Sequence, residues 1–314
     1  MKIIFFGSSD FGLPSLEYIK KDSSLSLPLI VTVPDRKSGR KQKLNPSPVK
    51  KWAILNNISL ETPEDLNNSK FISILKEINP DMFVVIAFRK IPESVFTIPK
   101  YGTVNVHASL LPKYRGAAPI QHSLMNGEVV TGLSTFIINN RIDTGSIIEQ
   151  LEVPISYEDD YGSLYLKLSS KSPEILASTI LKFADNKKML DLVTQDNSCV
   201  TYAPKIINSD CEIDWNQDSV DIYNKIRALY PKPGAYSFFD GMRIKIIKTE
   251  VISRSIDDSL NSGQIWVENN DILVKSGSGA IKIIRLQIEG KAPFNGLDFI
   301  NGYIKSQDGL RFGK

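Results

Sequence analysis

The chain opens on an unbroken apolar run, KIIFFG (2–7), which leads directly into SSDFG (8–12). A short apolar run without alternation is typical of a strand buried on both faces of a parallel sheet. Apolar residues then recur at every third position from 13 to 19, which predicts a helix. Ser9 or Asp10 is the expected cap of that helix. Strand, turn and helix in this order are the unit from which α/β domains are built.

Three more apolar runs repeat this pattern through the first part of the chain. They are LPLIVTV (27–33), PDMFVVIAF (80–88) and YGTVNVHA (101–108), and helical stretches such as SKFISILKEI (69–78) lie between several of them. FIINNRIDTGSIIEQLEV (136–153) has the pattern of two strands joined by a turn. The sequence therefore predicts an α/β domain with a mostly parallel sheet, whose ligands bind beyond the carboxyl ends of the strands.

The second half of the chain changes character. Residues 160–186 have a helical period, whereas 187–206 have no clean period. Short strand-like runs separated by Gly, Asn and Ser follow, which suggests a small β-barrel or sandwich. We therefore predict a catalytic α/β domain over residues 1–186, a linker over 187–206 and a smaller β domain over 207–314.

Composition limits the class of protein. The chain has 314 residues, 42% of them apolar, with 38 basic and 35 acidic residues and a formal charge of +3. Any nucleic-acid binding must therefore come from local charge. Two cysteines form neither a disulfide framework nor a metal motif, and no run approaches the roughly 20 apolar residues of a membrane helix. We expect a soluble, cytoplasmic protein with no metal and no membrane contact.

Polar residues interrupt the apolar run at 101–108. Asn105 and His107 share one face of this strand, because side chains alternate, and they lie near its carboxyl end. Asp143 lies at the bend of the 136–153 segment. An amide, an imidazole and a carboxylate in one crevice would handle protons and stabilise an oxyanion. The alternative is that Asn105 and His107 are satisfied polar groups of the core.

A second motif resembles a dinucleotide-binding loop only in part. Residues 7–12, GSSDFG, match G-x-G-x-x-G except that Ser9 occupies the middle glycine position. An imperfect copy of a short motif carries little weight. We interpret it as a plain turn between strand and helix.

A basic segment, DRKSGRKQKLNPSPVKK (35–51), is the strongest local charge in the chain. From Arg36 to Lys51 it has seven basic residues and no acidic one, and its Gly, Ser and Pro content predicts a loop. Such a segment is either a solvated loop or an arm that contacts RNA phosphates. We favour the RNA-contacting arm, with four candidate contacts: Arg36, Arg40, Lys41 and Lys43.

Together these motifs resemble the methionyl-tRNA formyltransferase family. The resemblance covers the whole chain and rests on NVHASLLPKYRGAAPIQ, on RIDTGSII, on the basic segment and on TYAPKI with EIDW. It implies a Rossmann-like domain without a dinucleotide and an OB-like barrel that helps to hold tRNA. It also implies transfer of the formyl group of 10-formyltetrahydrofolate to the α-amino group of initiator methionyl-tRNA, for translation initiation, by a monomer.

The resemblance also assigns roles to particular residues. It implies that Asn105, His107 and Asp143 are catalytic and that Arg40 is the important arginine of the basic segment. Contacts to the folate are implied for Phe88, Ser109, Leu110, Leu111 and Pro112. One stretch departs from the family, which usually has Ala-Tyr-Gly where this chain has Ala87-Phe88-Arg89.

Three rival functions remain at this stage. A formyltransferase for a sugar amine or a nucleotide-linked amine needs the same catalytic set but no basic segment. A hydrolase of 10-formyltetrahydrofolate uses water as the acceptor and needs no tRNA-binding barrel. A non-enzymatic RNA-binding protein would leave Asn105, His107 and Asp143 without a role.

Overall fold

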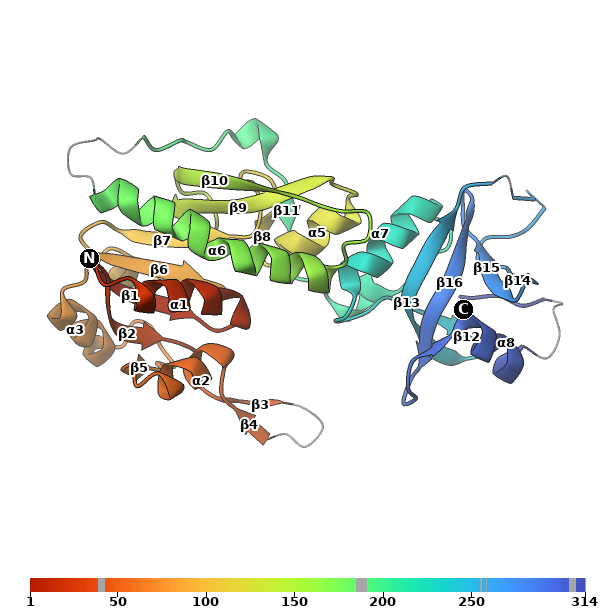
Figure 1. The fold of residues 1–314 in the computed structure, drawn as a ribbon, viewed down its shortest axis with the longest axis horizontal. Coiled ribbons are helices and arrows are strands. Elements are labelled where there is room, and N and C mark those ends of the chain that lie inside the picture. The colour runs from red at the N-terminus through yellow and green to blue at the C-terminus, as the bar shows by residue number, and fades with distance from the viewer. Residues whose placement is uncertain (39–42, 185–190, 255, 258, 305–308, 314) are drawn as a thin grey trace. The chain divides into compact units, whose positions relative to one another are not determined.

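A computed structural model describes the chain apart from residues 39–42, 185–190, 255, 258, 305–308 and 314 (Figure 1). The chain divides into two compact units. The first comprises residues 1–119, 130–154 and 165–203, and the second comprises 120–129, 155–164 and 204–314. The boundaries that the sequence suggested at 186 and 206 stay predictions. None of the described helices is long and apolar enough to cross a membrane.

The first unit is built on a seven-stranded sheet with the order β10-β9-β7-β6-β1-β2-β5. Its strands are β1 (Lys2–Gly7), β2 (Ser26–Val31), β5 (Leu60–Glu61), β6 (Met82–Ile86), β7 (Thr103–His107), β9 (Val130–Ile137) and β10 (Ile147–Pro154). Five neighbouring strands of this sheet are parallel: β7, β6, β1, β2 and β5. The other two, β9 and β10, are antiparallel and lie at one edge. The predicted mostly parallel α/β domain is confirmed.

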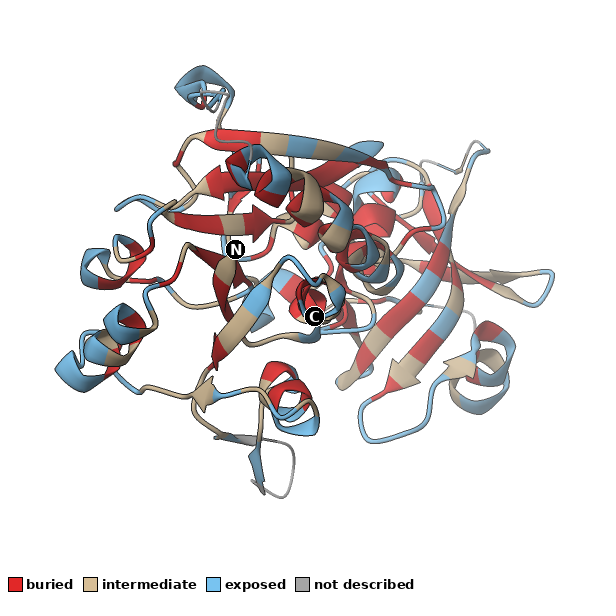
Figure 2. Cartoon of the chain, turned by 60° about the vertical axis from the view of Figure 1, so that its left-hand side comes forward, coloured by how far each residue is buried: buried red, intermediate tan, exposed pale blue. Residues whose placement is uncertain are grey.

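Helices cover both faces of this sheet. α1 (Leu13–Lys21) and α6 (Tyr161–Ala184) lie side by side, since the hydroxyls of Ser15 and Ser172 are 2.7 Å apart. Residues of α3 (Ser69–Ile78) and α4 (Glu93–Phe96) pack with alternate residues of β1 and β6 in one apolar cluster. Figure 2 shows the central strands as buried, which fits their continuous apolar sequence.

The carboxyl ends of β1, β6 and β7 meet at one edge of the sheet because these strands are parallel neighbours. The Ser8 hydroxyl donates to the carbonyl of Ala87 across this edge, at 2.8 Å. The prediction that Ser9 or Asp10 caps the first helix is wrong. A 3-10 turn, Asp10–Gly12, comes between Ser9 and the helix, so Gly12 occupies the N-cap position. The Asp10 carboxylate instead accepts from the Tyr165 hydroxyl.

The basic segment is more ordered than a loop, so that prediction is wrong in part. β3 (Arg36–Ser38) and β4 (Lys43–Asn45) pair as an antiparallel hairpin. The helix α2 (Pro48–Leu55) follows, and the Ser47 side chain caps it by accepting a backbone N–H. Strands of three residues are too short to show an alternation, which is why the sequence pattern missed them.

The second unit is an antiparallel sheet that curls as a half-barrel around its own core (Figure 1). Its strands are β12 (Tyr236–Phe239), β13 (Met242–Ile252), β14 (Ile265–Glu268), β15 (Asp271–Lys275), β16 (Ala280–Ile288) and β17 (Phe294–Asn295). Its helices are α7 (Ser219–Leu229) and α8 (Gly296–Tyr303), and it takes in most of α5 (Pro119–Met125). The expected small barrel-like domain is confirmed.

Candidate active site

His107 and Asp143 meet at the carboxyl edge of the first unit. β9 ends beside the amino half of β7, where Ile137 pairs with Val104, yet the turn after β9 brings Asp143 back to the end of β7. His107 Nδ1 and Asp143 Oδ2 are 3.8 Å apart, with 8% and 11% of their side chains exposed. This distance is that of an ion pair rather than a hydrogen bond. The expected approach of the two groups is present.

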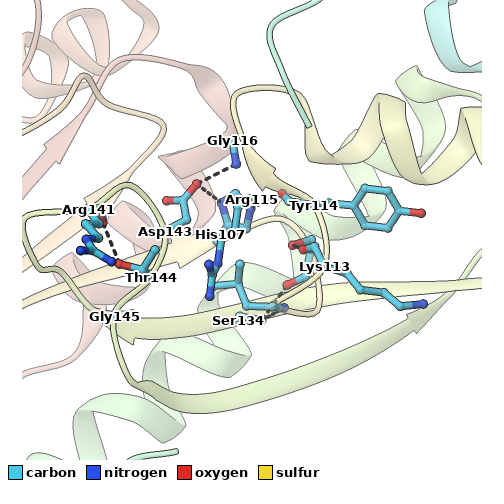
Figure 3. Close-up of polar contacts among 12 residues, drawn as sticks. His107, Lys113, Tyr114, Arg115, Gly116, Ser134, Arg141, Asp143, Thr144 and Gly145 are labelled. Atoms are coloured by element: carbon cyan, nitrogen blue, oxygen red, sulfur yellow. Dashed lines mark hydrogen bonds and ion pairs between the residues drawn. The ribbon is translucent and has the colours of Figure 1, made fainter. Parts of the chain in front are cut away.

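Backbone groups fix both side chains. The N–H of Gly116 donates to Asp143 Oδ2 at 2.9 Å, and His107 Nε2 lies 2.9 Å from the carbonyl oxygen of Tyr114. Since a carbonyl only accepts, Nε2 carries a proton in this contact. Figure 3 shows the Asp143 carboxylate directed at both the Gly116 amide and the His107 ring. Nδ1 is thus the ring nitrogen that remains for chemistry.

The turn that carries Asp143 has an unusual backbone. Asp143 has φ of 55°, in the left-handed region that Asp tolerates better than most residues. Gly145 follows, and a Cβ there would lie 1.6 Å from the carbonyl oxygen of Ile137. Only glycine therefore fits at 145, because the chain approaches β9 so closely there.

Asn105 lies two residues before His107 on β7 and therefore points to the same face of the sheet. Its neighbours Val104 and Val106 are buried, whereas Asn105 is only partly buried. Among the described residues, the Asn105 amide has no hydrogen-bond partner. It is therefore free to bind a ligand.

The segment after β7 forms a wall with its own internal bonds. The Ser109 hydroxyl donates to the carbonyl of Lys113 at 2.6 Å. The Leu111 N–H donates to the Ser134 hydroxyl at 3.0 Å, and that hydroxyl donates to the carbonyl of Ser109 at 2.6 Å. Leu111 is buried, and Leu110 and Pro112 are half-buried. These contacts hold the whole Ser-Leu-Leu-Pro stretch in place.

The departure at 87–89 is accommodated without strain at the arginine. Ala87, not Arg89, has the left-handed backbone, with φ of 51°. The Arg89 guanidinium donates to the carbonyls of Pro63 and Glu64. The Phe88 ring is half-buried and packs edge-on against Phe6, with ring centroids 5.6 Å apart. A cavity of about 370 Å³ opens beside Arg89, and residues 64–67, 90–93 and Asn140 complete its lining.

The structure describes two of the four basic residues that are candidates for binding tRNA. Arg36 begins β3 and is exposed, and Lys43 begins β4. Arg40 and Lys41 lie outside the described residues. Among the described residues, no group of three or more His, Cys, Asp or Glu side chains is arranged to hold a metal ion.

Sequence patterns missed several groups at the site. Two are backbone groups, the Tyr114 carbonyl and the Gly116 N–H. The sequence does not predict them, because every residue type has a backbone carbonyl. A third is Gln195, whose amide donates to the carbonyls of Asp143 and Gly145 at 2.9 and 2.8 Å. Gln195 lies in the segment expected to be a linker, and its sequence context gives no signal for this role.

Comparison with known proteins places this arrangement in a family. The family model for formyl transferase matches residues 1–180, and that for the formyl transferase C-terminal domain matches residues 205–304. Among solved structures, a sugar 3N-formyl transferase, WlaRD, superposes with a TM-score of 0.67 at 24% identity, over 93% of this chain and 99% of that one. HypX from Aquifex aeolicus, in complex with tetrahydrofolic acid, superposes with a TM-score of 0.64 at 16% identity, over 98% of this chain and 48% of that one.

Curated relatives are similar over nearly the whole chain. The methionyl-tRNA formyltransferase of Caldicellulosiruptor saccharolyticus is 39% identical over 98% of this chain and 99% of its own length. That of Dictyoglomus thermophilum is 40% identical over 96% of this chain and 97% of its own. The structural matches, at less than 25% identity, carry the fold alone. On the full-length sequence matches, the chain belongs to the methionyl-tRNA formyltransferase family.

Proposed function

We propose that this protein transfers the formyl group of 10-formyltetrahydrofolate to the α-amino group of initiator methionyl-tRNA. The observation that carries the proposal is the near-complete match to methionyl-tRNA formyltransferases, at 39–40% identity over 96–98% of the chain. The approach of His107 to Asp143 beside a free Asn105 amide supports it. We further propose that the protein acts as a monomer in the cytoplasm.

The folate would lie between two walls of the carboxyl edge. On one side is the fixed segment of Ser109, Leu110, Leu111 and Pro112, and on the other is the half-buried Phe88 ring. Phe88 offers the apolar face that a pterin ring needs, without the tyrosine hydroxyl usual in the family. Because Arg89 is occupied by two backbone carbonyls, it shapes the neighbouring cavity rather than closing it.

The reaction begins with attack of the neutral α-amino nitrogen on the formyl carbon. A free α-amino group has a pKa of about 7.7–8.0, so a useful fraction is neutral near pH 7. A new C–N bond forms while the formyl oxygen gains negative charge. The bond from that carbon to N10 of the folate then breaks, the oxygen returns to a carbonyl, and a proton moves from the former amine to N10. Holding the two substrates together supplies much of the rate.

Asn105 and His107 would stabilise the negative oxygen. The Asn105 amide has no partner among the described residues, so its N–H is available without breaking a bond. His107 already uses Nε2–H on the Tyr114 carbonyl, so the oxyanion would be bound by Nδ1–H of the imidazolium. Preorganised donors of this kind are among the largest contributions to catalysis.

Asp143 would act as the partner of the imidazolium and as the proton relay. Its Oδ2 is held by the Gly116 N–H, and its Oδ1 makes no hydrogen bond within the described part of the chain. Oδ1 is therefore the oxygen that would accept the amine proton, directly or through a water, and return one to N10. The other oxygen, Oδ2, lies 3.8 Å from Nδ1, close enough for its charge to favour the imidazolium.

The tRNA would be held by cations outside this site. In the first unit these are the cations of the basic hairpin and its connecting residues, Arg36, Arg40, Lys41 and Lys43. In the second unit they lie on β13, where basic and core residues alternate from 243 to 246, and on the neighbouring strand β16. This second group comprises Arg243, Lys245, Lys248 and Arg285.

One cation of the second unit lies over an aromatic ring, and two others are neighbours across the sheet. Arg243 lies over the ring of Tyr236, with 3.7 Å from its guanidinium carbon to the ring centroid, and pairs across the sheet with Phe238. Lys248 pairs across the sheet with Arg285. None of these cations forms an ion pair with a carboxylate of the described residues. Cations without a carboxylate partner fit an RNA backbone, and a cation beside an aromatic ring fits an unstacked base.

One assay tests the function against its rivals. The protein is incubated with 10-formyltetrahydrofolate labelled in the formyl group and with methionyl-tRNA, an amino sugar nucleotide, or no acceptor. We expect the label on methionyl-tRNA, with release as formate at least about 100-fold slower. Label on the amino sugar, or formate release that does not depend on tRNA, would overturn the proposal in favour of a sugar formyltransferase or a hydrolase.

A further inference from the structure

Residues 193–203, which we name the strap, tie together the two halves of the site. At one end, Val193 exchanges two backbone hydrogen bonds with Ile147, at 2.8 and 2.9 Å, just beyond the turn that carries Asp143. At the other end, β11 (Tyr202–Ala203) pairs in parallel with β8 (Arg115–Gly116). The strap therefore links the Asp143 turn to the segment whose backbone binds Asp143 and His107.

Gln195 is the buried residue of an otherwise exposed stretch. Between residues 191 and 200, all of which are described, it alone is classed as buried, with 6% of its surface exposed. A glutamine is seldom buried unless its amide is satisfied. The strap thus turns one polar side chain inward, toward the site.

The Gln195 amide uses its full hydrogen-bonding capacity. Nε2 donates to the carbonyls of Asp143 and Gly145, at 2.9 and 2.8 Å. Oε1 accepts from Nε and Nη2 of the buried Arg115, at 2.9 and 2.7 Å. The reverse orientation would set NH₂ against the guanidinium and oxygen against two carbonyls, so the partners fix the amide in one orientation.

These contacts hold both the backbone of Asp143 and the segment whose N–H donates to the Asp143 carboxylate. Gln195 holds the backbone of Asp143, which is in the left-handed region and needs support from its surroundings. It also holds Arg115, whose neighbour Gly116 donates to the carboxylate. At Gly116 a Cβ would lie 2.4 Å from the carbonyl oxygen of Ala203, so the strap is closely packed against β8.

We infer that Gln195 is a positioning residue that sets the Asp143 carboxylate relative to His107 and so controls the rate of formyl transfer. This inference rests on the proposed function. Gln195 itself touches neither substrate in the proposed arrangement. A 1 Å displacement of a catalytic group can cost about 100-fold in rate, which is the scale on which such a residue acts.

The test compares Gln195→Leu and Gln195→Glu with wild type, first confirming that the wild-type protein formylates methionyl-tRNA. We expect kcat to fall about 10- to 100-fold in both variants, while KM for either substrate changes by less than about threefold. Gln195→Glu keeps the size and the acceptor for Arg115 but loses both donors to the Asp143 turn, so it tests the inference even if Gln195→Leu folds poorly. Asn197→Ala is the matched control. Asn197 lies on the same strap and is exposed, and among the described residues its side chain hydrogen-bonds to Arg115 alone, at 3.4 Å. The kcat of Asn197→Ala should therefore stay within about twofold of wild type.

A double-mutant cycle separates positioning from general destabilisation. If Gln195 acts through Asp143, Gln195→Glu should cost less than about threefold when Asp143 is already Asn, because the two losses are coupled. An equal additional loss in that background, or an unchanged kcat in the single variant, would overturn the inference while leaving the proposed function intact. A wild-type protein that formylates no methionyl-tRNA would instead overturn the proposed function.

Discussion

The candidate active site and the candidate RNA-binding surfaces are held in opposite ways. At the site, His107 and Asp143 are nearly buried, and each is fixed by a backbone group. On the hairpin, Arg36 is exposed, and on the curled sheet Arg243, Lys245, Lys248 and Arg285 have no carboxylate partner among the described residues. The first arrangement gives fixed geometry, and the second gives diffuse attraction.

This difference predicts how each region responds to substitution. A buried, preorganised group has few substitutes, so its loss is concentrated in the chemical step. An exposed cation interacts with phosphates through solvent, so each one contributes little and salt weakens all of them. Large losses of kcat from single changes should thus come only from the site, and graded losses of tRNA affinity should come only from the surfaces.

The largest effect is expected for Asp143→Asn. The amide keeps the shape but can neither carry the negative charge beside His107 nor accept a proton, so kcat should fall about 10²–10⁴-fold. Asp81→Asn is the matched control, because Asp81 also accepts a backbone N–H, that of Lys2 at 2.6 Å, but at the amino end of β6. Steady-state rates with both substrates saturating measure the effect. Near-normal kcat in Asp143→Asn would contradict the assigned role.

Asn105→Ala should come next, with a loss of about 100-fold in kcat and little change in KM, as expected for a group that binds the oxyanion more tightly than the substrate carbonyl. Asn105→Asp has the same size but places a negative group toward the developing charge, so its kcat should be no higher than that of Asn105→Ala. A loss found only in the KM for folate would instead make Asn105 a ground-state contact.

The parts of the structure that the sequence predicted are those with a local pattern. β1 and β6 are continuous apolar runs, β7 is an apolar run that Asn105 and His107 interrupt, and the helices between these strands predict that they run parallel. The meeting of His107 with Asp143 needed more than a local pattern. The strand end and the turn make the two residues candidates, and the resemblance to the formyltransferase family implies that they act together.

The parts that the sequence did not predict depend on tertiary contacts. The strap has no period because its partners are Ile147 and β8, far away in the chain, rather than its own neighbours. Nothing local marks Gln195 as buried among exposed residues. The basic segment predicts a loop although β3 and β4 form a hairpin, because strands of three residues are too short to show an alternation.

The smallest effects per residue are expected on the basic surfaces. A double variant of the hairpin, Arg36→Ala with Lys43→Ala, and one of the curled sheet, Lys245→Ala with Lys248→Ala, should each leave kcat within about twofold of wild type and raise KM for tRNA. Because each phosphate contact contributes about 0.7–0.9 to the slope of log affinity against log salt, removing two should lower that slope by about 1.5.

The measurement is KM for methionyl-tRNA between about 50 and 200 mM salt, with KM for the folate as the internal control. A fall in kcat, or an unchanged salt slope, would show that these cations do not bind the RNA backbone and would remove the contrast between the two regions. A slope that changes for the sheet variant alone would place the phosphate contacts on the second unit.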